Sequence, residues 1–126
     1  MRIWRILFAF AALCNAAIGA AMLVFVSHAA ALIGVNGAGA SYATGLAGLL
    51  IACLGGVYAI VAWRPLANRP LVVLGAFGKA GAVVLASAHA YAGHIPHAVY
   101  ALAMGDLPLA LVFVVFLART RREGAR

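Results

Sequence analysis

The sequence predicts an all-α integral membrane protein, a four-helix bundle whose spans run up, down, up and down and whose N- and C-termini are both cytoplasmic. Composition is the first reason: 67% of the 126 residues are hydrophobic and 9% are charged, whereas roughly a quarter of the residues in a soluble domain carry charge. The second reason is that four apolar runs, each about 20 residues long, can cross a bilayer as helices. Residues 1–126 are expected to form a single four-span domain.

The first span is expected at about residues 6–26, with Asn15 as its only strongly polar side chain. The chain start also resembles a secretory signal peptide, whose apolar stretch is typically about 7 to 15 residues. Because the apolar run continues past Gly19 to Val26, a retained span is the preferred interpretation, and cleavage would leave three spans and an outward N-terminus. Residues 27–40, rich in glycine toward their end, are expected to connect this span to the second.

The second span is expected at about residues 42–63, a run that carries no charge. It should end at Arg64, where a short loop, residues 64–70, contains Pro65 and Pro70. Proline cannot continue a helix and biases the residue before it away from helical geometry. The loop should therefore turn the chain back into the membrane within a few residues.

The third and fourth spans each contain one charged residue. The third is expected at about residues 71–91 and contains Lys79, and the fourth is expected at about residues 98–118 and contains Asp106. Residues 93–97, which lie between them, are too few for anything but a hairpin turn.

Orientation follows from the arginines, because basic residues in short loops are retained in the cytoplasm. They precede the first span, lie between the second and third, and occupy a basic cytoplasmic tail at residues 119–126, while the two other loops have none. The chain is therefore expected to be a multi-pass protein of the inner (plasma) membrane. The formal net charge of +7 comes from these clusters rather than from an interspersed basic face, so no nucleic-acid partner is expected.

Lys79 and Asp106 are predicted to meet inside the membrane. On insertion-based scales each costs about 2.5 to 3.5 kcal/mol near the middle of a helix. With a rise of about 1.5 Å per residue, Lys79 lies roughly 12 Å and Asp106 roughly 18 Å from the cytoplasmic ends of their spans, a difference that a lysine side chain can bridge. Asn15 lies at a depth from which it can join this intramembrane polar site. The pair is either structural, fixing helix register, or functional, as a proton-accepting or ligand-anchoring site.

A helix kink is expected beside this site, at Gly105 and Pro108. Pro108 has no N–H to donate to the carbonyl of Met104, one turn earlier. The expected result is an accessible polar backbone group next to Asp106.

Histidines and cysteines offer weaker candidates. Four histidines are expected at or near the outward face: His28, His89, His94 and His97. They lack helical ligand spacings such as i and i+4, so interfacial hydrogen bonding is preferred over transition-metal or haem binding. Cys14 and Cys53 are expected to be small apolar fillers, and no cofactor is expected.

Small residues at helical spacing predict how the spans pack, because helices in lipid associate through close backbone approach. Two stripes are expected to seat neighbours: Gly48, Ala52 and Gly56 in the second span, with Gly45 and Gly55 nearby, and Gly75, Gly78 and Gly81 in the third.

Short motifs along most of the chain give a family resemblance. They are Asn15 and Gly19, Gly55-Gly56-Val57-Tyr58, the loop from Arg64-Pro65 to Arg69-Pro70, Gly75 through Gly78-Lys79, and Gly105-Asp106. In these features the chain resembles the small four-helix bacterial membrane proteins grouped as DoxX-like. The resemblance implies the four-helix architecture and a link to membrane redox complexes or quinone-dependent sulfur oxidation, and it carries no catalytic residue onto a position of this chain.

The expected function is non-enzymatic: a membrane subunit or a bundle that binds a lipophilic ligand, with the Lys79–Asp106 pair as a buried polar anchor. The alternatives are a quinone-linked redox subunit and a small proton-coupled exporter, although the first span lacks the acidic residue typical of four-helix exporters. The expected partners are the lipid bilayer and either a membrane protein or a second copy of the chain.

Overall fold

The computed structural model describes residues 1–121, all of which lie in helices or short connections. The helices are α1 (Arg2–Val24), α2 (Val26–Leu32), α3 (Ala40–Trp63), α4 (Arg69–Tyr91), α5 (His97–Met104) and α6 (Asp106–Arg119). Four stretches are long and apolar enough to cross a membrane, namely α1, α3, α4 and the combined α5 and α6. The expected all-helical fold with four membrane-length helices is confirmed. The outer part of the expected basic tail, residues 122–126, lies outside the described residues.

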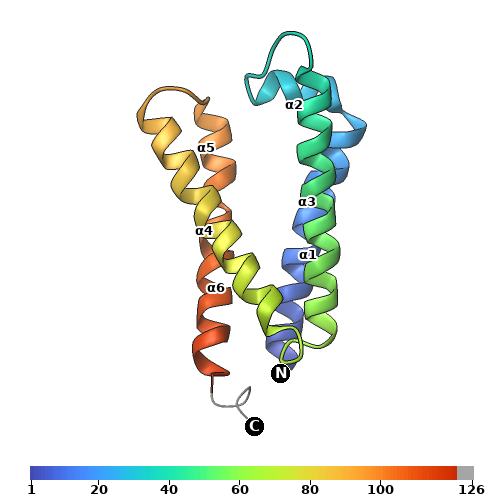
Figure 1. Cartoon of the computed structure of the whole chain (residues 1–126), viewed down its shortest axis with the longest axis vertical. Helices are drawn as coiled ribbons and strands as arrows, with labels where there is room; N and C mark the ends of the chain where they lie inside the picture. The colour runs from blue at the N-terminus through green and yellow to red at the C-terminus, as the bar shows by residue number, and fades with distance from the viewer. Residues whose placement is uncertain (122–126) are drawn as a thin grey trace.

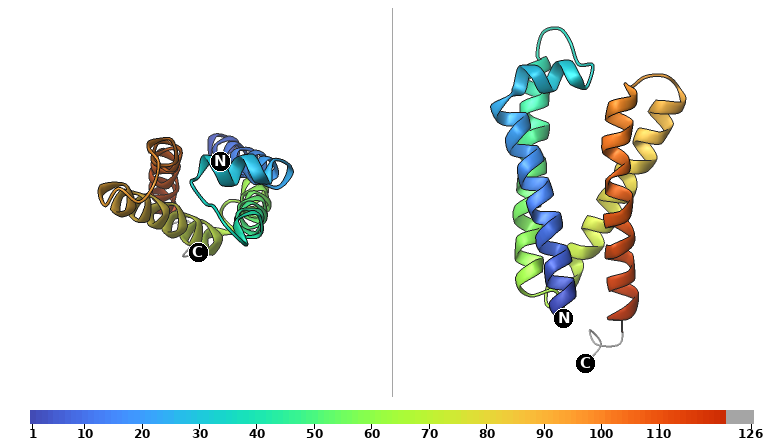
Figure 2. Two further views of the ribbon diagram at one scale, coloured as in Figure 1. Left: turned by 90° about the horizontal axis from the view of Figure 1, so that it is seen from above. Right: turned by 180° about the vertical axis from the view of Figure 1, so that it is seen from behind.

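The long helices form two pairs. Figure 1 shows α1 beside α3, and α4 beside the column made by α5 and α6. The pairs meet at the end of the molecule where the chain begins and diverge toward the end that carries α2 and α5 (Figure 2). We call the closed end the arginine end, because Arg5, Arg64 and Arg69 lie there. Consecutive long helices run in opposite directions, so the start of α1 and the end of α6 both lie at the arginine end (Figure 1).

Glycines allow α1 and α3 to pack with their backbones in contact. A Cβ atom added at Gly19 would lie 2.5 Å from the amide nitrogen of Ala52, and one added at Gly55 would lie 2.8 Å from that of Ala16. Gly48 also lies in this contact, as predicted. Helices in lipid are held by such close approach, because the surrounding hydrocarbon supplies no hydrophobic driving force between them.

Ala52, the second member of the predicted stripe on α3, lies in the same contact, facing Gly19, but other members of the two stripes do not pack. A Cβ atom at Gly56, Gly78 or Gly81 would have no neighbour within 4 Å among the described residues. Only Gly75 in the third span is closely packed, with Tyr58 and Phe113 ring atoms 2.8 Å from its Cβ position. The contact on α3 passes through Gly48, Ala52 and Gly55, so the predicted spacing of four found the first two positions and missed the third by one residue.

The pair Gly55 and Gly56 gives a matched test of this packing. Ala is about 1 kcal/mol better than Gly in a helix, so Gly56→Ala should be neutral or slightly stabilising. Gly55→Ala gains the same propensity but forces α1 away, and it should lower the free energy of unfolding by roughly 1 to 3 kcal/mol. Unfolding in mixed detergent micelles with increasing dodecyl sulfate measures both. Equal stability of the two variants would contradict the packing described here.

An aromatic cluster joins the two helix pairs at the arginine end. Phe8 of α1 packs on Phe113 and Phe116 of α6, with ring centroids 5.0 and 5.1 Å apart, and Tyr58 of α3 packs edge-on to Phe113 at 5.1 Å. Trp4 packs edge-on to Phe116. The Phe8–Phe113 pair is tilted and the other three pairs are edge-to-face, a preferred geometry for aromatic rings. The cluster is the aromatic part of a buried core that also contains Ala11, Ala12, Val61, Val72 and Ala76. The stripes of small residues in the sequence did not predict it.

Arginines at this end also satisfy helix-terminal carbonyls. The Nε of Arg5 donates to the carbonyl of Ala62 at 3.1 Å, in the last turn of α3. Arg69, at the start of α4, donates to the carbonyl of Leu117 at 3.2 Å and to the Thr120 hydroxyl at the end of α6. The last four carbonyls of a helix have no intrahelical donor, and cations near them are favoured by the helix dipole. These arginines therefore stabilise the ends of α3 and α6.

The helix α2 was not expected, because residues 27–40 were treated as a connection. Phe25, with φ −109° and ψ 43°, ends α1, and the chain bends into a second short helix. This helix ends in a Schellman motif: Gly34 has φ +76°, and the Val35 N–H donates to the carbonyl of Ala30 at 2.9 Å. Residues 26–32 contain no glycine or proline, so only the later glycines stop the helix.

Candidate functional site

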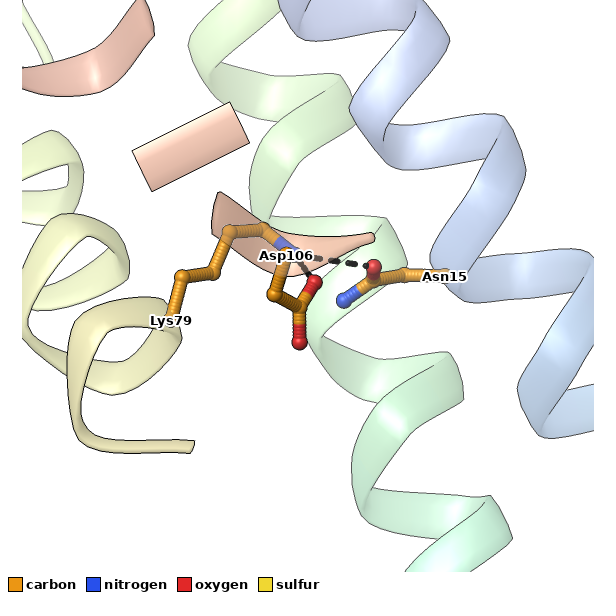
Figure 3. Close-up of polar contacts among 3 residues, drawn as sticks. All are labelled: Asn15, Lys79 and Asp106. Carbon is orange, nitrogen blue, oxygen red and sulfur yellow. Dashed lines mark hydrogen bonds and ion pairs between the residues drawn. The ribbon is translucent and has the colours of Figure 1, made fainter. Parts of the chain in front are cut away.

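Three polar side chains from three helices meet between the two helix pairs. The Lys79 Nζ, on α4, donates to Asp106 Oδ1 on α6 at 2.6 Å and to Asn15 Oδ1 on α1 at 3.4 Å (Figure 3). Lys79 and Asp106 are thus in direct contact, and Asn15 extends the group to the other helix pair. We call these three residues the polar triad.

The interruption between α5 and α6 positions Asp106. Gly105 separates the two helices at the place where the sequence predicted a kink, and its N–H donates to the carbonyl of Leu102 at 3.1 Å, three residues back. Asp106 is the first residue of α6, so its carboxylate lies at a helix N-terminus, where the dipole favours negative charge. Pro108 falls in the first turn of α6, where a missing N–H breaks no helical hydrogen bond.

The amine of the pair is covered, and the carboxylate is accessible. The Lys79 side chain is 5% exposed and the Asp106 side chain is 34% exposed. Asn15 is also buried, at 8%. In a low-dielectric interior an ion pair persists when its members also have other hydrogen bonds, and Asn15 supplies one to the lysine. The triad carries no net formal charge.

Tyr58 lies beside the triad, although the sequence did not predict it as a site residue. The Lys79 Nζ lies 5.4 Å from the centroid of its ring, within the range of a cation–π interaction. The ring is also held between Gly75 and Phe113. A signal existed in the sequence: Tyr42, Tyr91 and Tyr100 lie near the ends of spans, as interfacial tyrosines do, but Tyr58 does not.

A cavity of 540 Å³ lies between the helix pairs, and the polar triad and Tyr58 line it. The remaining lining is apolar and includes Ile18, Met22, Ile51, Leu54 and Leu102. The cavity also reaches Ile33, which directly follows α2, and Val99 in α5. Both helices lie at the end where the helix pairs diverge (Figure 1). Its volume and its few convergent polar groups are those of a small-molecule site.

A second hollow, of 730 Å³, lies at the arginine end and is lined by Arg2, Arg5 and Trp63 among others. It is larger than the central cavity but shallow, and its arginines are exposed to the surroundings. No buried polar side chain lines it. The central cavity is therefore the candidate site.

The structure does not gather the histidines into a site. His28 lies on α2, His89 at the end of α4, His94 in the hairpin and His97 at the start of α5, and all four are exposed. Only the rings of His89 and His94 are close, with centroids 5.6 Å apart. Over residues 1–121 no three His, Cys, Asp or Glu side chains come close enough together to hold a metal ion. Cys14 and Cys53 are both free thiols.

Comparisons with protein-family models, with curated proteins and with solved structures found no match to this chain. We therefore infer the function from the geometry of the polar triad and its cavity.

Proposed function

We propose that this protein is a four-span protein of the bacterial inner membrane with both termini in the cytoplasm, related to the DoxX-like proteins. The arginine end would face the cytoplasm, because it carries the basic residues of the chain ends and of the loop between α3 and α4. The connections after α2 and after α4, which lack lysine and arginine, would face outward.

Cysteine labelling tests this orientation. In a background with Cys14→Ala and Cys53→Ala, single cysteines at the exposed positions Ala38 and Ala92 should react with a membrane-impermeant maleimide added to intact spheroplasts. A cysteine at Ala67, exposed in the loop between α3 and α4, should react only after the membrane is permeabilised. Labelling of Ala67→Cys in intact spheroplasts would reverse the assignment.

The molecular function we propose is non-enzymatic: the protein binds a lipophilic ligand between its two helix pairs. It does so as a single chain, as a homo-oligomer, or as a subunit beside a membrane protein partner. One observation carries the proposal: the cavity has apolar walls and its polar groups are concentrated in the triad and Tyr58. Such a surface fits a molecule with an apolar body and one polar end. Ionisable groups inside a membrane are expensive, and the triad places them where a ligand can use them.

Two glycines of α4 provide the test. Gly78 lines the cavity and Gly81 does not, and a Cβ atom at either position meets no atom within 4 Å among the described residues. Gly78→Leu should fill the cavity without disturbing the fold, whereas Gly81→Leu should leave it open. We expect purified protein in nanodiscs to bind a fluorescent fatty probe in saturable fashion, and Gly78→Leu, but not Gly81→Leu, to abolish this binding. Identical binding by the two variants would refute a ligand site in this cavity.

A further inference from the structure

We propose that the ligand of this cavity is an uncharged amphiphile whose polar end is a hydrogen-bond donor, a hydroxyl above all, and that the donor binds Asp106. This inference rests on the proposed function and specifies the chemistry of the ligand. It starts from the unequal exposure of the two partners of the ion pair.

The group that the ion pair offers to a ligand is an acceptor. Lys79 is covered and directs its ammonium to Asp106 Oδ1 and Asn15 Oδ1, while the Asp106 side chain is 34% exposed and lines the cavity. Within residues 1–121, Asp106 Oδ2 has no hydrogen-bond partner. A carboxylate is an acceptor only, so the group that completes it must be an O–H or N–H donor.

A second polar group without a hydrogen-bond partner among the described residues, the Asn15 amide nitrogen, makes a hydroxyl the ligand group that fits the site best. Asn15 uses its Oδ1 to accept from Lys79, and its amide nitrogen has no partner in the described part of the chain. Asn15 lines the same cavity as Asp106. A hydroxyl can donate to the carboxylate and accept from an amide N–H at once, whereas an ether or a ketone can only accept.

The charge of the triad argues for an uncharged ligand. Lys79 already neutralises Asp106, and over the described residues these are the only two charged side chains that line the cavity. A cationic or anionic head would therefore leave one uncompensated charge in a low-dielectric interior, which is strongly unfavourable. The apolar walls accept a hydrocarbon body, which can enter where the cavity extends toward Ile33 and Val99.

A series of probes with one chain length tests the inference: decanol, decyl methyl ether, decanoate and decylammonium. Affinities are measured by displacement of the fatty probe from the unmodified protein in nanodiscs, with Gly78→Leu nanodiscs as the control for partitioning into lipid. A hydrogen bond to a charged acceptor predicts that decanol binds at least about tenfold more tightly than the ether. The doubly substituted Lys79→Met, Asp106→Leu protein, which keeps an uncharged cavity, should bind alcohol and ether equally.

The outcomes separate the two claims. If decylammonium or decanoate binds most tightly, or if the ether equals the alcohol, the ligand class proposed here is wrong while the cavity remains a binding site. If none of the four probes distinguishes the unmodified protein from Gly78→Leu, the binding function itself is wrong. A preference for decanol that survives in the double variant would show that the Asp106 carboxylate is not the group that recognises the hydroxyl.

Discussion

Replacing Lys79 by methionine should lower the free energy of unfolding by about 3 kcal/mol, because it leaves the Asp106 carboxylate inside the bundle without its cation. This is the lower end of the range for breaking a buried ion pair, since the Asp106 side chain is 34% exposed. Methionine keeps an unbranched apolar side chain of similar length, so the loss of the charge dominates the change. Asn15 also loses its hydrogen-bond donor in this variant. Reversible unfolding in mixed micelles with dodecyl sulfate, followed by circular dichroism, gives the value.

Arg64→Met is the matched control for Lys79→Met. It removes a charge from the exposed end of α3, where Arg64 lies beside the Trp63 ring and forms no ion pair with any of the described residues. Its effect should stay within about 0.5 kcal/mol, as for most surface substitutions. A Lys79→Met protein as stable as the Arg64→Met protein would mean that the buried ion pair does not hold the bundle together.

Among substitutions in the apolar core, Phe113→Ala should destabilise the protein most. It should lower the free energy of unfolding by about 2 to 4 kcal/mol. Phe113 is fully buried and packs on Phe8, Tyr58 and the backbone at Gly75, so it contacts three other helices from α6. Lipid is as apolar as the core, so the loss comes from packing contacts rather than from transfer out of water. The same micelle unfolding measures it, and the variant should also lower the temperature at which the protein aggregates.

Phe77→Ala separates this packing effect from the removal of any phenyl ring. Phe77 lies on α4 and is 78% exposed, in a position to contact lipid. Its loss should change the stability by less than about 0.5 kcal/mol. Comparable losses for Phe77→Ala and Phe113→Ala would show that the aromatic cluster does not join the two helix pairs.

The spans could be predicted from the sequence because a bilayer imposes simple rules: a spanning segment must be helical, apolar and about 20 residues long. The ion pair could be predicted for a related reason. Two opposite charges at compatible depths on consecutive spans, Lys79 and Asp106, have few other partners available in hydrocarbon. The interruption at Gly105 followed from the local chemistry of glycine and proline.

The packing faces could not be predicted in the same way. Alanine and glycine are so frequent here that several faces of one helix have small residues at helical spacing, and Gly55 could not be told from Gly56. The contribution of Tyr58 depends on how α3 meets α4 and α6, which no local pattern encodes. The cavity lies between helix pairs that meet at one end of the molecule and diverge toward the other (Figure 2), an arrangement that no local sequence pattern encodes.

The central claim is that Lys79 and Asp106 stabilise the bundle by neutralising each other. A double-mutant cycle on Lys79→Met and Asp106→Leu tests it most directly, because the cycle isolates the coupling energy between the two side chains. Removing both charges leaves no orphaned ion, so the double variant should be more stable than either single variant, with a coupling energy of at least about 2 kcal/mol. If the two losses simply add, within about 0.5 kcal/mol, then the amine and the carboxylate do not neutralise each other inside the bundle.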